Sequence, residues 1–242
     1  GVIDQDTLFY REVSPDTDAE QAIAGNSFPR MLYMRYEGLT NFKLFKWLYQ
    51  QGLVDCSTTK FEDMKVPDAL LQSYRDLLKE AQLMPSTTLV FDGSCTKRWV
   101  NAICAFRNMH LITDQSVEML KGELLQLLDE LEEIAVAGQF RSGKPVSIYI
   151  SDMDIEATYC YVAARHYRAS CIETFSINSL RSADPGMFEH VKRWITSLSR
   201  FATLISCSGE LQRIHFFKRQ RAIVAELERE GLEPSPSEVF QE

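Results

Sequence analysis

Between residues 86 and 182 the chain alternates short apolar runs with segments of helical periodicity, and this pattern constrains its fold most. The runs TTLVFDG at 87–93, PVSIYIS at 145–151 and CIETFSI at 171–177 have the length and composition of buried strands. The segments between them place apolar residues three and four positions apart, as helices do. Strands that alternate with helices favour a layered α/β fold, with a mostly parallel sheet and helices on both faces.

The same periodicity predicts individual elements inside this region. MHLIT, residues 109–113, is expected to form a further short strand. The apolar stripe over 117–134 indicates the strongest helix, with Asp114 or Ser116 as its cap. EATYCYVAARHY, residues 156–167, is expected to be the helix that follows the strand at 145–151.

The regions outside the α/β core are predicted to be helical or loosely ordered. Helix signals near Asn41 and at Pro67 indicate a helical pair before the core, and apolar periodicity returns after Arg181. The expected organisation is an acidic arm at 1–30, a helical region at 31–85, the α/β core at 86–182, C-terminal helices packing on the core at 183–233 and a tail at 234–242.

Composition narrows the class of protein. The net charge of −8 disfavours a main role in coating nucleic acid, because phosphate binding relies on Lys and Arg. No apolar run reaches the roughly 18 residues that a membrane span needs, so no membrane association is expected. Six cysteines without a CxxC pair favour neither a zinc ribbon nor a disulfide framework. We therefore expect an intracellular protein in a reducing compartment, most simply the cytoplasm.

Acidic residues gather at the predicted strand ends. Asp92, Asp114, Asp152, Asp154 and Glu156 all follow expected strands. Carboxylates at one sheet edge are what a Mg²⁺ or Mn²⁺ site for phosphate chemistry requires, and Asp92, Asp114, Asp152 and Asp154 would be the metal ligands. The alternative is structural: Asp152 or Asp154 caps the expected helix, and Glu156 interacts with its dipole.

Two other groups of residues are candidates for function. Cys95 follows a strand and precedes Lys97 and Arg98, a setting that can activate a thiol, although a buried inert cysteine fits equally. Clustered aromatic and basic residues can bind a protein partner when they are exposed. These candidate partner-binding residues are Trp47, Tyr49, Arg213, Phe216, Phe217, Lys218 and Arg219.

GKPVSIYIS at 143–151, a short turn and TYCYVAARHYRAS at 158–170 resemble the core unit of the Clp protease and crotonase superfamily, in its signal-peptide-peptidase branch. LISCSGELQRI at 204–214 and AELEREGLEP at 225–234 are similar to the closing helices of that fold. The resemblance covers at most residues 87–233. It places the nucleophile at Ala157 or Thr158, with no glycine pair for an oxyanion hole and no histidine base, and so implies a descendant without acyl-transfer chemistry.

These observations lead to two functional expectations. The first is a non-catalytic interaction or scaffold subunit of a larger assembly, which binds a protein partner or forms a homo-oligomer and needs no cofactor. The second is a hydrolase or nuclease that depends on Mg²⁺ or Mn²⁺ and acts on phosphate esters through Asp92, Asp152, Asp154 and Glu156.

Overall fold

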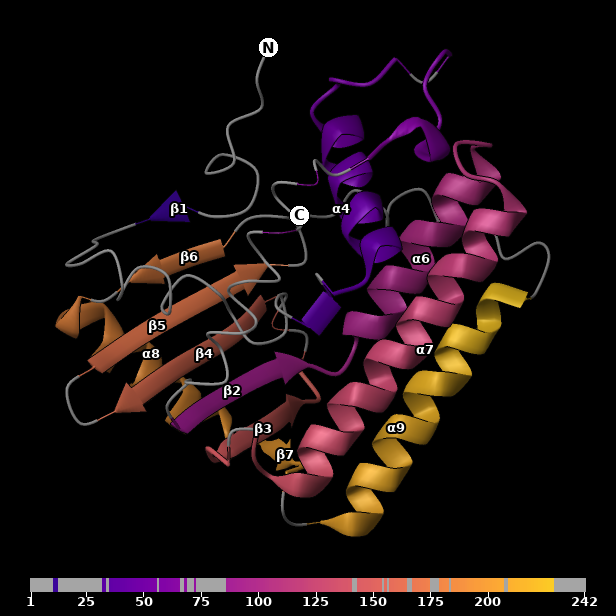
Figure 1. Ribbon diagram of the computed structural model, residues 1–242. Coiled ribbons are helices and arrows are strands. Elements are labelled where there is room, and N and C mark those ends of the chain that lie inside the picture. Colours follow the sequence, from indigo (N-terminus) through magenta and orange to yellow (C-terminus); the bar gives the residue numbers. More distant parts are fainter. Residues whose placement is uncertain are drawn as a thin grey trace.

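The computed structural model of the chain is organised around one mixed β-sheet with helices on its two faces (Figure 1). The structure describes residues 11–12, 32–33, 35–55, 57–65, 68, 72, 86–140, 143–153, 155, 157–164, 167–174, 179–182, 184–206 and 209–228. Most of the predicted acidic arm, most of the helix predicted after Pro67 and the C-terminal tail lie outside these residues.

The sheet has seven strands in the order β1-β6-β5-β4-β2-β3-β7. Strands β2 and β3 confirm the two buried runs at 87–93 and 145–151, and the third run begins within β5. The bounds are Arg11–Glu12 for β1, Ser86–Asp92 for β2, Val146–Ser151 for β3, Ala157–Ala164 for β4, Tyr167–Thr174 for β5, Ser179–Ser182 for β6 and Ala202–Leu204 for β7.

The prediction of a mostly parallel sheet is wrong. Among the described strands, β1 with β6 and β2 with β3 pair in parallel, whereas the other four pairings are antiparallel. The main cause is the segment expected to be a helix after β3, which forms strand β4 instead. Its alternating pattern sends Tyr159 and Tyr161 to one face and Cys160 to the other, a period of two rather than 3.6. Strand β4 then runs antiparallel to β2.

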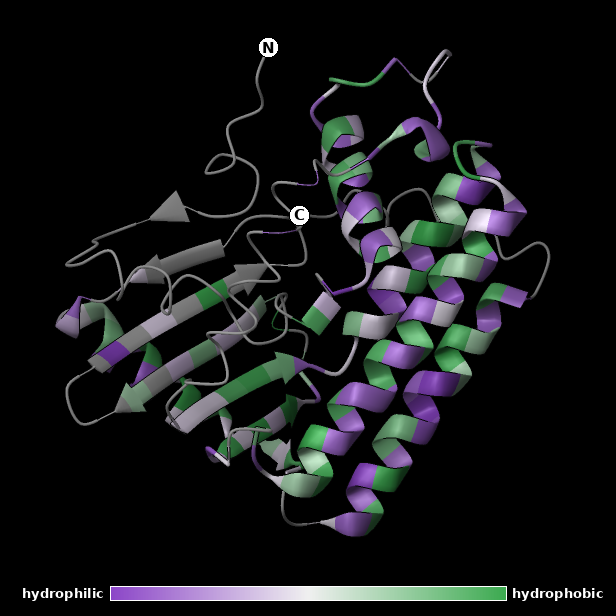
Figure 2. Cartoon of the chain, viewed as in Figure 1, coloured by the Kyte–Doolittle hydropathy of each residue, from purple (hydrophilic) through white to green (hydrophobic). Residues whose placement is uncertain are grey.

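Strand β2 shows how the two faces of the sheet are covered. Leu89 and Phe91 belong to the larger apolar core, and Val90 between them belongs to the core on the opposite face. Figure 2 shows that the middle of this strand is hydrophobic, as expected for a strand buried on both sides. Helix α8 covers one face, and helices α4, α6, α7 and α9 contribute to the core on the other (Figure 1).

The helices have the following bounds: α4 Glu37–Gln50, α6 Cys95–Asn108, α7 Asp114–Ala137, α8 Pro185–Leu198 and α9 Glu210–Val224, with short 3₁₀ helices η1 Phe61–Asp63 and η3 Ala225–Glu228. Among the helices that the structure describes, none has the length and hydrophobicity to cross a lipid bilayer. Helices α7 and α9 lie side by side and antiparallel (Figure 1). Lys121 near the start of α7 pairs with Glu228 after α9, and Arg221 pairs with Asp129 and Glu132 further along α7.

The strand predicted at 109–113 is also wrong. These residues turn between α6 and α7, and His110 takes a left-handed backbone conformation with φ of 57°. Leu111 is buried, and its carbonyl oxygen accepts a hydrogen bond from the Phe61 N–H at 3.0 Å. Thr113, rather than Asp114 or Ser116, caps α7: its hydroxyl accepts the Ser116 N–H at 3.2 Å.

Helix α4 is almost enclosed, since every residue from Gly38 to Lys46 is buried. Its N-terminus lacks a cap from its own flanking residue and receives one from another helix. The carboxylate of Glu123 on α7 accepts the backbone N–H groups of Gly38 at 3.1 Å and Leu39 at 2.7 Å. This contact satisfies two of the donors that a helix start leaves open.

Candidate functional site

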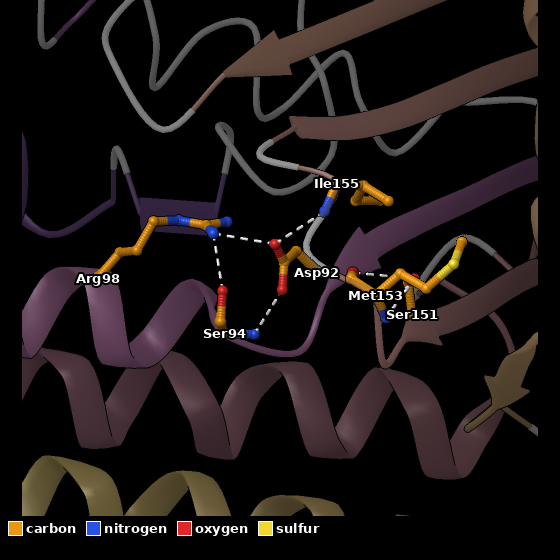
Figure 3. A network of polar contacts seen from close by, with 6 residues as sticks. All are labelled: Asp92, Ser94, Arg98, Ser151, Met153 and Ile155. Atoms are coloured by element: carbon orange, nitrogen blue, oxygen red, sulfur yellow. Dashed lines mark hydrogen bonds and ion pairs between the residues drawn. The ribbon is translucent and has the colours of Figure 1, made fainter. Parts of the chain in front are cut away.

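Asp92 lies at the end of β2 and joins three segments of the chain (Figure 3). One carboxylate oxygen accepts the Ser94 N–H at 2.7 Å, and the other accepts Arg98 Nη1 at 2.9 Å and the Ile155 N–H at 3.2 Å. The same Arg98 nitrogen also donates to the Ser94 hydroxyl at 2.7 Å. Asp92 is only 3% exposed, so this network fixes the start of α6 and the connection before β4 to the strand end.

A pocket of about 100 Å³ opens beside this network. It lies where β2 passes into α6, the position at which α/β sheets commonly bind ligands. Its walls come from the end of β2, the start of β4, residues 32–33 and helices α4, α6, α7 and α9. The lining residues are Leu32, Tyr33, Lys43, Phe91, Asp92, Cys95, Thr96, Arg98, Trp99, Leu124, Leu127, Leu128, Leu131, Ala157, Thr158, Phe216 and Gln220.

The wall of the pocket is mostly aromatic and aliphatic, with polar groups at a few points. The Lys43 ammonium lies 5.1 Å from the ring centre of Tyr33 and 5.5 Å from that of Trp99. Lys43 is 5% exposed, so its ammonium group lies among these rings rather than in solvent. Gln220 on α9 and Thr96 on α6 are further buried polar residues of the helical wall, with 2% and 9% exposure.

The predicted acidic residues have different surroundings in the structure. Asp92 is committed to the network at the strand end, whereas Asp114 is exposed and pairs with Arg107 at 2.7 Å. Asp152 is exposed after β3, and Asp154 and Glu156 lie outside the described residues. Within the part of the chain that the structure describes, no group of three or more His, Cys, Asp or Glu side chains could hold a metal ion. The metal-dependent enzyme stays a prediction.

The predicted partner-binding residues fall into two groups. Trp47, Tyr49 and Phe216 are partly buried against the main core, and Phe217 is fully buried in it. Phe217 therefore belongs to the core and offers no area to a partner in this structure. Lys218 and Arg219 are exposed on α9, and Arg213 is partly exposed.

Several residues singled out in the sequence, Asp92 and Phe216 among them, line the pocket. Cys95, Ala157 and Thr158 all contribute to its wall. Sequence reasoning missed Lys43 and Gln220. The signal for Gln220 was its position, because it lies three residues after the core residue Phe217 and shares its helical face. Lys43 carried no such signal, since a lysine between aromatic residues usually extends to solvent.

No family model, no curated protein and no solved structure matches this chain. The resemblance to the Clp protease and crotonase superfamily therefore stays a prediction, as does the loss of catalysis that it implies.

Proposed function

We propose that this chain is a binding protein that holds a small organic ligand in the pocket at the end of β2. The observation that carries the proposal is the composition of the pocket wall, in which leucines and aromatic rings surround a few buried polar groups. Pockets that bind small molecules have this composition, because apolar area provides affinity and a few polar groups fix orientation.

The size of the pocket bounds the ligand. An engineered apolar cavity of about 150 Å³ accommodates benzene, so a pocket of about 100 Å³ suits a ligand with few non-hydrogen atoms or one end of a larger molecule. The pocket needs no catalytic residue for this role. Partly buried hydrogen bonds between Asp92, Ser94 and Arg98 connect the end of β2 with α6 beside the pocket.

A thermal-shift series tests the proposal. Small aromatic compounds such as phenol, toluene, indole and benzoate, at millimolar concentration, should include at least one that raises Tm saturably, since a ligand that binds the folded state stabilises it. Leu127→Trp fills the pocket and should abolish the shift. Leu125→Trp is the matched control, because Leu125 is similarly half-buried on α7 but does not line the pocket.

Cys95 provides a second readout. It is partly accessible in the pocket wall, so a bound ligand should slow its alkylation, measured by mass spectrometry of the peptide that contains it. Without any saturable shift or any protection of Cys95 across the series, the proposal would be abandoned. The same holds if Leu127→Trp leaves both effects unchanged.

A second candidate function, the interaction subunit, is supported by exposed apolar residues at one end of the α7–α9 pair. Val136, Leu211 and Ile214 are 56%, 70% and 46% exposed. Because α7 and α9 are antiparallel, the C-terminal turn of α7 lies near the N-terminal turns of α9. Leu211 and Ile214 are three residues apart and share a helical face. We call these three residues the α7–α9 patch.

Light scattering after size-exclusion chromatography tests this candidate with the chain at increasing concentration. Association through the α7–α9 patch should be lost in the double variant Leu211→Lys and Ile214→Lys. It should persist in Leu53→Lys, which changes an equally exposed leucine elsewhere. This candidate would be excluded if the chain is a monomer at every concentration and binds no partner through these residues.

A further inference from the structure

The two helices of the α7–α9 pair carry opposite charges. Helix α7 contains seven acidic residues and one lysine, whereas α9 contains four basic residues and one glutamate. The helices lie side by side and antiparallel (Figure 1). An acidic row and a basic row therefore adjoin on one side of the molecule.

Each helix also has an exposed stripe of three residues at spacings of three and four, which places them on one helical face. The stripes are Asp129, Glu133 and Val136 on α7 and Leu211, Ile214 and Lys218 on α9. Arg221 follows Lys218 by three residues and pairs with Asp129, so the two stripes border the same seam between the helices. Because the helices are antiparallel, the apolar ends of both stripes lie at the same end of the pair.

We propose that the chain forms a symmetric homodimer in which α7 and α9 of one copy pack on α9 and α7 of the other. This inference rests on the second candidate function and specifies the partner as a second copy of the chain. The charges support this partner: a protein with a surface of one sign would match only one of the two rows, whereas a second copy matches both.

A two-fold axis that runs along the seam, between the two copies, produces this arrangement. It keeps the apolar ends together, so that the α7–α9 patches of the two copies meet and cover side chains that are exposed in the single chain. It also brings Glu133 of each copy opposite Lys218 of the partner subunit. The same attractive pair therefore occurs twice in one dimer.

Sedimentation velocity over a concentration series measures the dissociation constant of the dimer. Glu133→Lys and Lys218→Glu each place two pairs of like charges in the dimer, so each should raise the dissociation constant at least about tenfold. An equimolar mixture of these two variants can form a mixed dimer in which both pairs are attractive again. This mixture should associate with a dissociation constant within about threefold of that of the parent chain, as should the double variant.

Matched controls make the same changes of charge at exposed positions outside the helix pair. Asp152→Lys follows β3, and Arg193→Glu lies on α8, on the other face of the sheet. Both should leave the dimer unchanged. All four altered side chains are exposed, so every variant should keep the circular dichroism spectrum and the Tm of the parent chain.

The outcomes separate this inference from the function on which it rests. A dimer that Leu211→Lys with Ile214→Lys abolishes, but that the charge reversals leave unchanged, would overturn the arrangement and leave the second candidate function standing. Weakening by both single variants without recovery in their mixture would overturn it as well. A chain that is monomeric at every concentration would overturn the homodimer, and the second candidate function would then depend on a different partner that binds through Leu211 and Ile214.

Discussion

At the scale of single residues, Asp92 has a structural role that could not be predicted from its position at a strand end. A carboxylate there can bind a metal, cap a helix or pair with a base. In the structure it accepts hydrogen bonds from Ser94, Arg98 and Ile155. A charged group that is buried and bonded in this way is costly to neutralise, because its partner cation loses the compensating charge.

Asp92→Asn should therefore lower the free energy of unfolding by about 3 kcal/mol. Asp152→Asn should change it by no more than about 0.5 kcal/mol, because Asp152 is exposed. Urea denaturation of the two variants beside the parent chain measures both values. Adding Mg²⁺ to each sample tests the metal alternative: a Mg²⁺-dependent rise in stability that either variant abolishes would contradict a purely structural role for these acids.

The sequence predicted residues at the pocket better than it predicted their roles. Cys95 was singled out after the end of a predicted strand and lines the pocket, as do Ala157 and Thr158, which were named through the family resemblance. Lys43 could not be chosen in advance, since its burial depends on which distant helices pack around it, whereas Gln220 could be placed on the helical face of Phe217. An aromatic residue in a basic run faces the core more often than a partner, and Phe217 is buried in the core.

At the scale of elements, the strands β2 and β3 and the helix α7 were predicted nearly to their ends. Strand β4 was not. Its sequence ATYCYVAA contains alanines that suit a helix, and only pairing with β2 and β5 selects the strand. The wrong prediction for this element also changed the predicted orientation of the strands, because a helix there would have made the next strand parallel to β3.

Helix α4 depends on a carboxylate from α7. Burial raises the pKa of Glu123 above its ordinary value of 4.5, and this effect exceeds the opposing effect of the N–H groups of Leu39 and Gly38. The folded chain therefore holds this proton to a higher pH than the unfolded chain. Its contribution to stability is complete below about 4.5 and is lost as the pH rises through the raised pKa.

Glu123→Gln removes this titration. The free energy of unfolding of the parent chain, relative to that of the variant, should fall as the pH rises from 4.5 through the raised pKa and then stay constant. Urea denaturation of both proteins across this range measures the difference. A difference that rises with pH in this window would show that the helix N-terminus holds the carboxylate in its charged form more strongly than burial disfavours it.

At the scale of the whole molecule, the sheet separates two apolar cores. The larger core joins residues from Leu32 to Leu227, and the smaller core lies under α8. The neighbouring residues Leu89 and Val90 of β2 belong to different cores, so neither core can lose its packing without disturbing the same strand. We expect both to unfold together.

The three tryptophans make this testable. Trp99 lies in the larger core, and Trp194 contacts Tyr159 beside the smaller one. Variants that keep only Trp99 or only Trp194, with phenylalanine at the other two positions, should give fluorescence transitions in urea with the same midpoint as circular dichroism. An earlier transition for the Trp194 variant would mean that the α8 layer opens by itself.

The pairing of β2 also determines when the sheet can form as the chain is synthesised. Ser86 and Thr87 pair with Ala163 and Val146, so both neighbours of this strand emerge after helices α6 and α7 are complete. Until then, among the described helices of the larger core, only α4, α6 and α7 can cover Leu89 and Phe91 of β2. Such late pairings between distant residues slow folding and leave strand edges open to other chains. The leucine stripe of α7 thus becomes a temporary cover for the strand that it later helps to bury.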